Sequence, residues 1–146
     1  MNEKTTDYLD QVVFDRIKEN PVFSALGNRV IRSLVASAQI EKFERGDVLI
    51  QQDDYGDFAY LMLEGKISVE LELPSGVSEI AIVDAGQIIG EISVFSNTKR
   101  SATVRAIGDV KAAKLKRTII RGFVEELRWS HIVGQFSGLS KVYSVV

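Results

Sequence analysis

The sequence predicts a mainly β fold with helices at both ends of the chain, and three observations predict it. Apolar residues recur at helical spacing before residue 38, at a period of two between Ile40 and Leu115, and at helical spacing again after residue 117. The strand-like runs are short and are separated by Gly, Asp, Pro or Ser. No helical pattern lies between them, which disfavours a parallel doubly wound sheet and indicates a sandwich, a jelly roll or a barrel.

The N-terminal segment, residues 1–38, is predicted to be helical. Its first apolar stripe recurs at every fourth position, at Leu9, Val13 and Ile17. Asn20-Pro21 ends that helix, because Asn is a favoured cap and Pro a favoured first residue of a new turn. A further apolar stripe follows Gly27 at Val30, Ile31, Leu34, Val35 and Ala38.

The central segment, residues 39–116, is predicted to consist of strands. "KISVELEL" alternates most clearly, with Ile67, Val69, Leu71 and Leu73 on one face. The last segment, residues 117–146, returns to helical spacing, and its apolar tail is interrupted by Gly134 and Gly138. A chain of 146 residues suits one domain with a substantial core.

Composition excludes several classes of function. The net charge is −2, so no general positive field attracts DNA or anionic lipid. There is no cysteine, and His131 is the only histidine, which excludes disulfides, Cys/His metal clusters and cysteine nucleophiles. No apolar run is long enough to span a membrane, and the polar N-terminus does not look like a secretory signal. We therefore expect a cytoplasmic protein with no membrane association, no metal and no catalytic residues.

One acid and one arginine carry the chemistry. Glu91 follows Gly90 at the end of an apolar strand, and a carboxylate there can accept a hydrogen bond from a hydroxyl such as a ribose 2′-OH. Arg100 precedes the small residues 101–103, and its planar guanidinium suits a phosphodiester. Taken singly, Glu91 is more simply a solvated surface residue, and Arg100 an exposed strand-end residue or the ion-pair partner of Glu91. Together they match a cyclic phosphate fused to a ribose.

The stretch from Gly90 to Val104 resembles the phosphate-binding cassette of cyclic nucleotide-binding domains, as found in catabolite activator proteins, cyclic-nucleotide-dependent kinases and gated channels. Family members carry Gly-Glu-Leu-Ala-Leu and, a few residues later, Pro-Arg-Ala-Ala-Thr, whereas this chain has "GEISV" at 90–94 and "RSAT" at 100–103 with no gap. Residues 45–69 also resemble the hairpin run that precedes the cassette. The likeness extends over about residues 22–128.

The resemblance implies an eight-stranded jelly-roll β-barrel, or double-stranded β-helix, with the cassette at residues 88–104 and with N- and C-terminal helices flanking the barrel. It implies that Glu91 binds the ribose hydroxyl, that Arg100 binds the phosphate, and that backbone N–H groups complete the site. The ligand-binding set is Gly90, Glu91, Ile92, Ser93, Arg100, Ser101, Ala102 and Thr103. The expected pocket lining or lid is Ile82, Val83, Ile89, Trp129 and Tyr143, with His131 and Phe136 as further lid candidates.

Two departures from the family pattern bear on the site. Lys99 replaces the usual proline, which loosens the turn and adds a positive charge. Gln52 replaces a glycine of a tight turn, so we expect a strained positive φ at Gln52 or a different turn. Gly56-Asp57 is most simply a turn between strands.

These observations predict a regulatory sensor module that binds cAMP or cGMP, with Ser101 leaving the choice of purine open. Its C-terminal helix would move on binding and signal to a partner or a downstream domain. The rivals are a barrel that acts as a non-binding scaffold, and the effector domain of a transcription regulator. About 20 residues remain after the first C-terminal helix, too few for a DNA-binding helix-turn-helix, so we expect no DNA binding by this chain alone. A homodimer or a downstream effector domain is the expected macromolecular partner.

Overall fold

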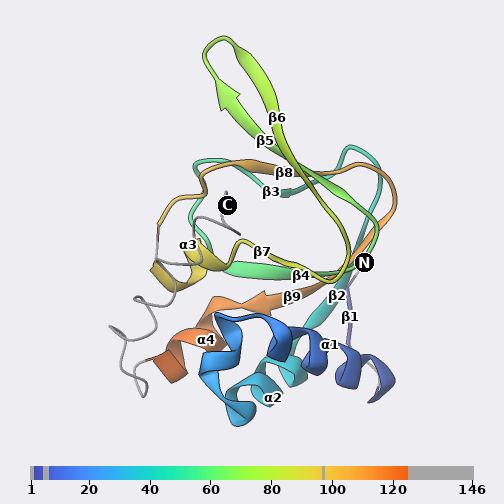
Figure 1. Cartoon of the computed structure of the whole chain (residues 1–146), viewed down its shortest axis with the longest axis vertical. Coiled ribbons are helices and arrows are strands. Elements are labelled where there is room, and N and C mark those ends of the chain that lie inside the picture. The colour runs from blue at the N-terminus through green and yellow to red at the C-terminus, as the bar shows by residue number, and fades with distance from the viewer. Residues whose placement is uncertain (1, 5–6, 97, 125–146) are drawn as a thin grey trace.

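The computed structural model describes residues 2–4, 7–96 and 98–124 (Figure 1). The helices are α1 (Asp7–Glu19), the 3-10 helix η1 (Phe23–Leu26), α2 (Asn28–Ser37), α3 (Glu91–Ser96) and α4 (Arg117–Val124). The strands are β1 (Asn2–Lys4), β2 (Gln39–Phe43), β3 (Val48–Ile50), β4 (Phe58–Glu64), β5 (Ile67–Leu73), β6 (Gly76–Val83), β7 (Ile88–Ile89), β8 (Thr103–Ala106) and β9 (Val110–Lys116).

The strands form two antiparallel sheets, with orders β1-β2-β9-β4-β7 and β3-β8-β5-β6. The predicted mainly β class is therefore confirmed. The expected eight-stranded jelly-roll barrel is not closed among the described residues, whose strands pair as two separate sheets with β1 at one edge. The β5–β6 hairpin projects beyond the rest of the molecule at the top of Figure 1.

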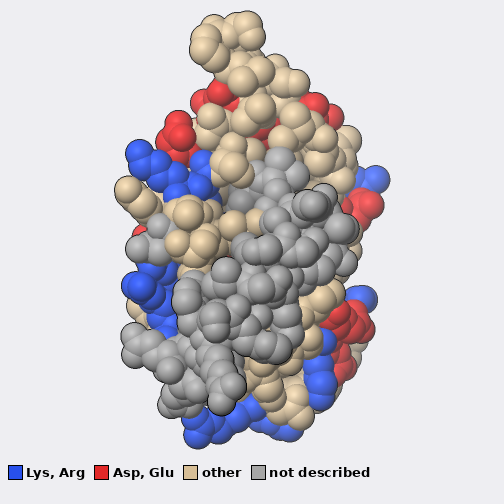
Figure 2. Space-filling model, turned by 60° about the vertical axis from the view of Figure 1, so that its left-hand side comes forward, with Lys and Arg blue, Asp and Glu red and all other residues tan. Residues whose placement is uncertain are grey.

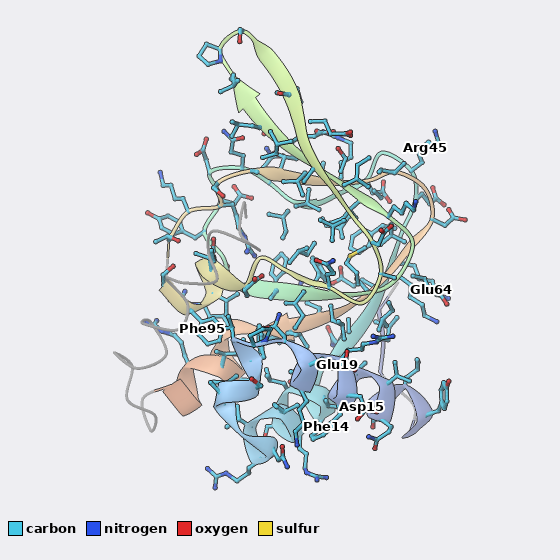
Figure 3. All side chains as sticks on the ribbon, in the orientation of Figure 1. Phe14, Asp15, Glu19, Arg45, Glu64 and Phe95 are labelled. Atoms are coloured by element: carbon cyan, nitrogen blue, oxygen red, sulfur yellow. The ribbon has the colours of Figure 1, made fainter. Side chains whose placement is uncertain are left out.

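Helices α1, α2 and α4 form a layer on one side of the five-stranded sheet, and α3 lies at the end of β7 (Figure 1). Asn20 begins the turn that leads into η1, as its residue type predicts, because its Oδ1 accepts hydrogen bonds from the backbone N–H groups of Val22 (2.9 Å) and Phe23 (3.1 Å). Phe23 packs edge-on against Phe95, with ring centroids 5.3 Å apart, where α3 meets the helical layer (Figure 3). The helical layer thus holds α3 from one side.

The core has two parts. One lies between the helices and the face of β4 and β9 that is turned toward them, and it includes Ile17, Ile31, Leu34, Leu61 and Leu115. The other lies between the two sheets and includes Ile50, Val69, Ile89, Ala102 and Val104. The second cluster adjoins the cassette, so the side chains between the sheets form an apolar floor beside Gly90 and Arg100.

No helix among the described residues is both long and apolar enough to cross a membrane.

Candidate functional site

The cassette begins with a backbone turn that only glycine adopts easily. Gly90 follows β7 with φ at +82°, in the left-handed region that side chains disfavour. A Cβ at this position would lie 2.5 Å from Nη1 of Arg100 and 3.0 Å from Cδ1 of Ile50. Gly90 is therefore required twice, for the turn itself and for the close approach of the arginine.

Arg100 is buried, with 2% of its surface exposed. Its Nη1 donates to the carbonyl oxygen of Gly90 at 2.8 Å, and its Nη2 donates to the carbonyl oxygen of Phe58. The guanidinium carbon lies 5.2 Å from the centre of the Phe58 ring. Burial lowers the pKa of Arg100 to about 10, and nearby acidic groups, Asp57 foremost, oppose that shift. The side chain therefore remains a cation at neutral pH, held by backbone carbonyls instead of an ion pair.

The main chain of Arg100 is also fixed. Its N–H donates to the carbonyl oxygen of Asp54 at 2.7 Å, and its carbonyl oxygen accepts from the N–H of Asp53 at 2.9 Å. One residue further out, Tyr55 and Lys99 form an antiparallel bridge, and Nζ of Lys99 lies 5.7 Å from the centre of the Tyr55 ring. The loop 51–57 is thus paired with the end of the cassette. At the outer edge of this pairing, the positive charge of Lys99 lies above the ring of Tyr55.

Gly56 closes this arrangement. A Cβ on Gly56 would overlap Cβ of Ser93 and lie 3.1 Å from Cζ of Arg100. Such a contact forces something to shift, because protein interiors leave no spare volume. Gly56 is therefore more than a turn residue, since it lets the loop lie directly on α3 and Arg100.

Glu91 is buried, with 2% exposure, so the interpretation of it as a solvated surface residue is wrong. Burial raises the pKa of Glu91 to about 7, while a backbone hydrogen bond and the charge of Arg100 oppose the rise. Within the described ranges no ion pair joins Glu91 to Arg100. The interpretation of Arg100 as an exposed strand-end residue is also wrong, because its side chain is buried. The site thus combines a buried cation with a buried carboxyl group that changes charge near neutral pH.

Arg100 faces a hollow of about 380 Å³. The hollow is lined by Val48, Leu49, Ile50, Gln51, Asp54, Tyr55, Asp57, Phe58 and Arg100. Its lining combines the apolar residues of β3 with charged and polar side chains around Arg100.

The other predicted ligand-binding residues are placed as follows. Ile92 is half-buried and packs on the core that joins the helices to the five-stranded sheet, and Ser93 is buried in α3. Ala102 is fully buried between the sheets, whereas Ser101 is exposed. The hydroxyl of Thr103 is committed elsewhere, because it donates to Oε2 of Glu72 at 2.5 Å. The structure thus brings Gly90, Glu91 and Arg100 together, and it turns the Thr103 hydroxyl toward β5.

The predicted lining residues divide. Ile89 is buried and Val83 packs on the same cluster between the sheets, next to the cassette. Ile82 is 55% exposed and pairs with Ser68, while its neighbour Ala81 packs on that cluster. Ile82 is therefore largely exposed to solvent, whereas Ala81 contributes to the core between the sheets. Trp129, His131, Phe136 and Tyr143 lie outside the described residues.

Two features of the site were missed in the sequence. Phe58 supplies both a carbonyl acceptor and a ring face to Arg100. The strained turn residue is Asp53, with φ at +72°, so of the two expected alternatives, a positive φ at Gln52 or a different turn, the structure has the different turn. The Gly56-Asp57 pair was the available signal that this loop approaches something closely, but no local pattern says that the neighbour is Arg100.

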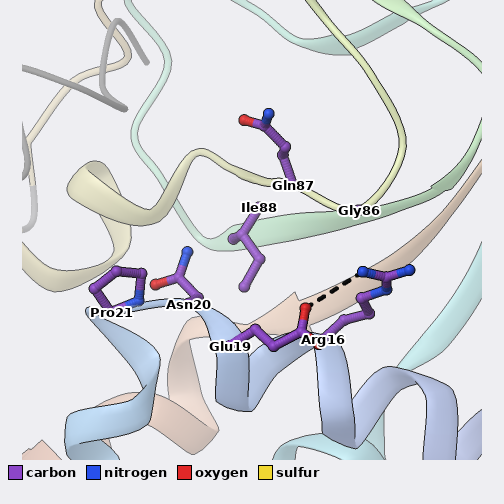
Figure 4. Close-up of a pocket in the computed structure, with 7 residues that line it drawn as sticks. All are labelled: Arg16, Glu19, Asn20, Pro21, Gly86, Gln87 and Ile88. Atoms are coloured by element: carbon purple, nitrogen blue, oxygen red, sulfur yellow. Dashed lines mark hydrogen bonds and ion pairs between the residues drawn. The ribbon is translucent and has the colours of Figure 1, made fainter.

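A second hollow, of about 210 Å³, lies between the end of α1 and the turn before β7 (Figure 4). Its charged residues are Arg16 and Glu19, which pair with each other at 3.3 Å and are both largely exposed. No group of His, Cys, Asp or Glu side chains in the described part of the chain could hold a metal ion. The hollow at Arg100 therefore remains the better-supported site.

A family model described as the cyclic nucleotide-binding domain matches residues 40–126. A cyclic nucleotide-gated cation channel protein of Drosophila melanogaster is 29% identical over 104 residues, which cover 67% of this chain and 15% of the channel protein. This chain therefore spans a small part of that relative's length.

Two solved structures are similar in fold. A cyclic nucleotide-binding domain from Methylobacillus flagellatus has a TM-score of 0.73 and 26% identity, covering 92% of this chain and 77% of the other. The regulatory domain of Toxoplasma gondii PKA, in co-crystal with cAMP, has a TM-score of 0.77 and covers 84% of this chain and 47% of its own. Its identity is 19%, so that likeness shows the fold alone.

Proposed function

The chain belongs to the cyclic nucleotide-binding domain family, and from this premise we propose that it is a regulatory module that binds cAMP or cGMP through Arg100 and Glu91. The observation that carries the proposal is the buried guanidinium of Arg100 beside a hollow of about 380 Å³. A buried cation without a carboxylate partner is costly unless its site serves an anion. A cyclic phosphodiester carries one negative charge and would supply that anion.

The hydrogen-bonding capacity of Arg100 fits this role. A guanidinium has five N–H donors, and the carbonyl oxygens of Gly90 and Phe58 take one each. Donors therefore remain for the exocyclic oxygens of a phosphate while the two carbonyls hold the fork in place. A site positioned before the ligand arrives binds with a smaller loss of entropy.

Glu91 would serve the sugar. As a carboxylate it accepts hydrogen bonds only, which suits a ribose hydroxyl and repels the phosphate. Because Glu91 is buried, its carboxylate has few hydrogen bonds from water in the ligand-free protein. A ribose hydroxyl would donate a hydrogen bond in their place. Phosphate and sugar would thus be told apart by two side chains nine positions apart in sequence.

The site is connected to the C-terminal helix by Arg117, the first residue of α4. The N–H of Arg117 donates to the carbonyl oxygen of Asp57 at 2.9 Å, and Nη1 lies 3.9 Å from Oδ1 of the same residue. Asp57 is also the acid that chiefly supports the charge of Arg100. A nucleotide at Arg100 would change the field at Asp57 and so bias α4, in the manner of a population shift.

The wider proposal follows from the same site. The module would act by binding and not by catalysis, in the cytoplasm, and would report to a partner or to an effector domain, with no DNA contact of its own. The rival is a non-binding scaffold with the same fold.

Calorimetry with cAMP and with cGMP tests the proposal. We expect binding of at least one nucleotide, about 100-fold weaker in Arg100→Ala because a charge-assisted contact is lost. Arg16→Ala is the matched control, since Arg16 is an exposed arginine that pairs with Glu19 along α1. Absence of heat with both nucleotides would favour the scaffold.

A further inference from the structure

The side-chain amide of Gln52 pairs with the main chain of β5. Nε2 of Gln52 donates to the carbonyl oxygen of Glu72 at 3.1 Å, and the backbone N–H of Glu72 donates to Oε1 of Gln52 at 2.7 Å. An amide side chain offers one donor and one acceptor as a peptide group does, so Gln52 extends the pairing of β5 without being part of a strand. Glu72 lies near the end of β5, where the hairpin leaves the body of the molecule (Figure 1).

The carboxylate of Glu72 strengthens this contact. Its Oε2 accepts from Nε2 of Gln51 at 2.8 Å and from the hydroxyl of Thr103 at 2.5 Å. The Thr103 oxygen in turn accepts from the backbone N–H of Gln52 at 3.1 Å. We call these four residues, Gln51, Gln52, Glu72 and Thr103, the glutamine clamp. In the view of Figure 2, acidic side chains lie at the base of the projecting hairpin, and no charged side chain is seen at its tip.

The clamp adjoins the residues that hold Arg100. Asp53 follows the clamp directly, and its φ of +72° is uncommon for a residue with a side chain, so contacts on both sides must keep it there. On the far side of that turn, Asp53 and Asp54 exchange backbone hydrogen bonds with Arg100. The turn is therefore fixed at one end by Glu72 and at the other by the main chain of the phosphate-binding arginine.

We infer that Gln52 is a positioning residue for the phosphate contact: its amide, clamped to Glu72, sets the place of the loop on which the backbone of Arg100 rests. The inference depends on the proposed function, because it concerns how well that site holds a cyclic phosphate. Thr103 belongs to the same device, since its buried hydroxyl serves Glu72. The role of Gln52 does not require that it touch the nucleotide.

The test uses the full chain and cyclic nucleotides in which one or the other exocyclic oxygen is replaced by sulfur. A well-placed Arg100 distinguishes these two diastereomers. In Gln52→Ala we expect about tenfold weaker binding of the natural nucleotide, the loss that follows when roughly one net hydrogen bond no longer supports a contact. We also expect a smaller affinity ratio between the two diastereomers. A residue that only stabilised the fold would leave that ratio unchanged.

Two further variants make the experiment decisive. Gln52→Glu has the same shape and keeps the acceptor for the N–H of Glu72, but it loses the donor, so it should behave as Gln52→Ala does even if the alanine variant folds poorly. Gln11→Ala removes an exposed glutamine bonded to Asp15 on α1 and should bind as the wild type does. If the wild type binds and both Gln52 variants keep its diastereomer ratio, the inference is overturned, whether or not their affinity falls. If the wild type itself binds no nucleotide, the proposed function fails first.

Discussion

Replacing Glu91 with glutamine should stabilise the ligand-free protein at pH 8 and weaken nucleotide binding. The carboxyl group is 2% exposed, and burial raises its pKa from the ordinary 4.5 to about 7. The folded protein therefore holds a proton that the unfolded chain releases between these two values. The contribution of Glu91 to stability is therefore greatest below pH 4.5, falls as the pH rises toward 7, and levels off above it.

The size of the effect follows from that difference. Each unit of pKa is worth about 1.4 kcal/mol, so the ionised carboxylate lowers the free energy of unfolding by about 3 kcal/mol at pH 8. Glutamine has nearly the same shape and no charge, so it avoids this penalty. The stability advantage of Glu91→Gln over the wild type should grow by about 2 to 3 kcal/mol between pH 5 and pH 8.

Urea unfolding of both proteins at several pH values measures this advantage. His131 and every other titratable group are common to both proteins, so the difference isolates Glu91. A difference that stays flat with pH, or that favours the wild type more strongly as the pH rises, would refute the reasoning from burial.

The proposed function predicts that nucleotide affinity changes with pH in the opposite direction to stability. If the nucleotide requires the ionised carboxylate, wild-type affinity should increase about tenfold from pH 6 to pH 8, because the protonated fraction falls through the pKa. Glu91→Gln should bind about tenfold more weakly than the wild type at pH 8 and should show no such pH dependence.

Three other predictions concern the frame of the site. Gly56→Ala should lower both nucleotide affinity in calorimetry and the melting temperature, because its Cβ would meet Ser93 and Arg100, whereas Gly108→Ala has open space and should leave both near wild type. Gly90→Ala should lose at least about tenfold in affinity, since its Cβ would lie 2.5 Å from Nη1 of Arg100; unchanged binding would mean that this arginine is placed differently. Asn20→Ala should cost about 1 kcal/mol in urea unfolding with no change in affinity, because the hydrogen bonds that it removes, to Val22 and Phe23, involve neither Glu91 nor Arg100.

Local patterns predicted much of this molecule. The alternation in "KISVELEL" corresponds to β5, the stripe at Leu9, Val13 and Ile17 to α1, and Asn20 to the turn that leads into η1. The sequence also predicts Gly90, Glu91 and Arg100 as a set, since their spacing and chemistry suit a sugar and a phosphate. Such features depend on periodicity and residue type, which the chain carries locally.

Other features arise only from long-range contact. No local rule indicates that the carbonyl oxygen of Phe58 accepts from Arg100, which is 42 positions away, or that Gln52 pairs with Glu72. The replacement of glycine by Gln52 predicts either a positive φ at Gln52 or a different turn, and hydrogen bonds to β5 and to Arg100 give the different turn, with the positive φ at Asp53. The division of the strands into two sheets likewise depends on pairings across the fold.

The sequence by itself determined the order of elements, the mainly β class and the pair of side chains suited to a cyclic nucleotide. Only the tertiary structure decided that both side chains are buried, that backbone carbonyls hold the cation, and that the carboxyl group titrates near neutral pH. The physical reason is that charge and hydrogen-bond energies depend on how much water remains around a group. That quantity is set by residues brought together from distant parts of the chain.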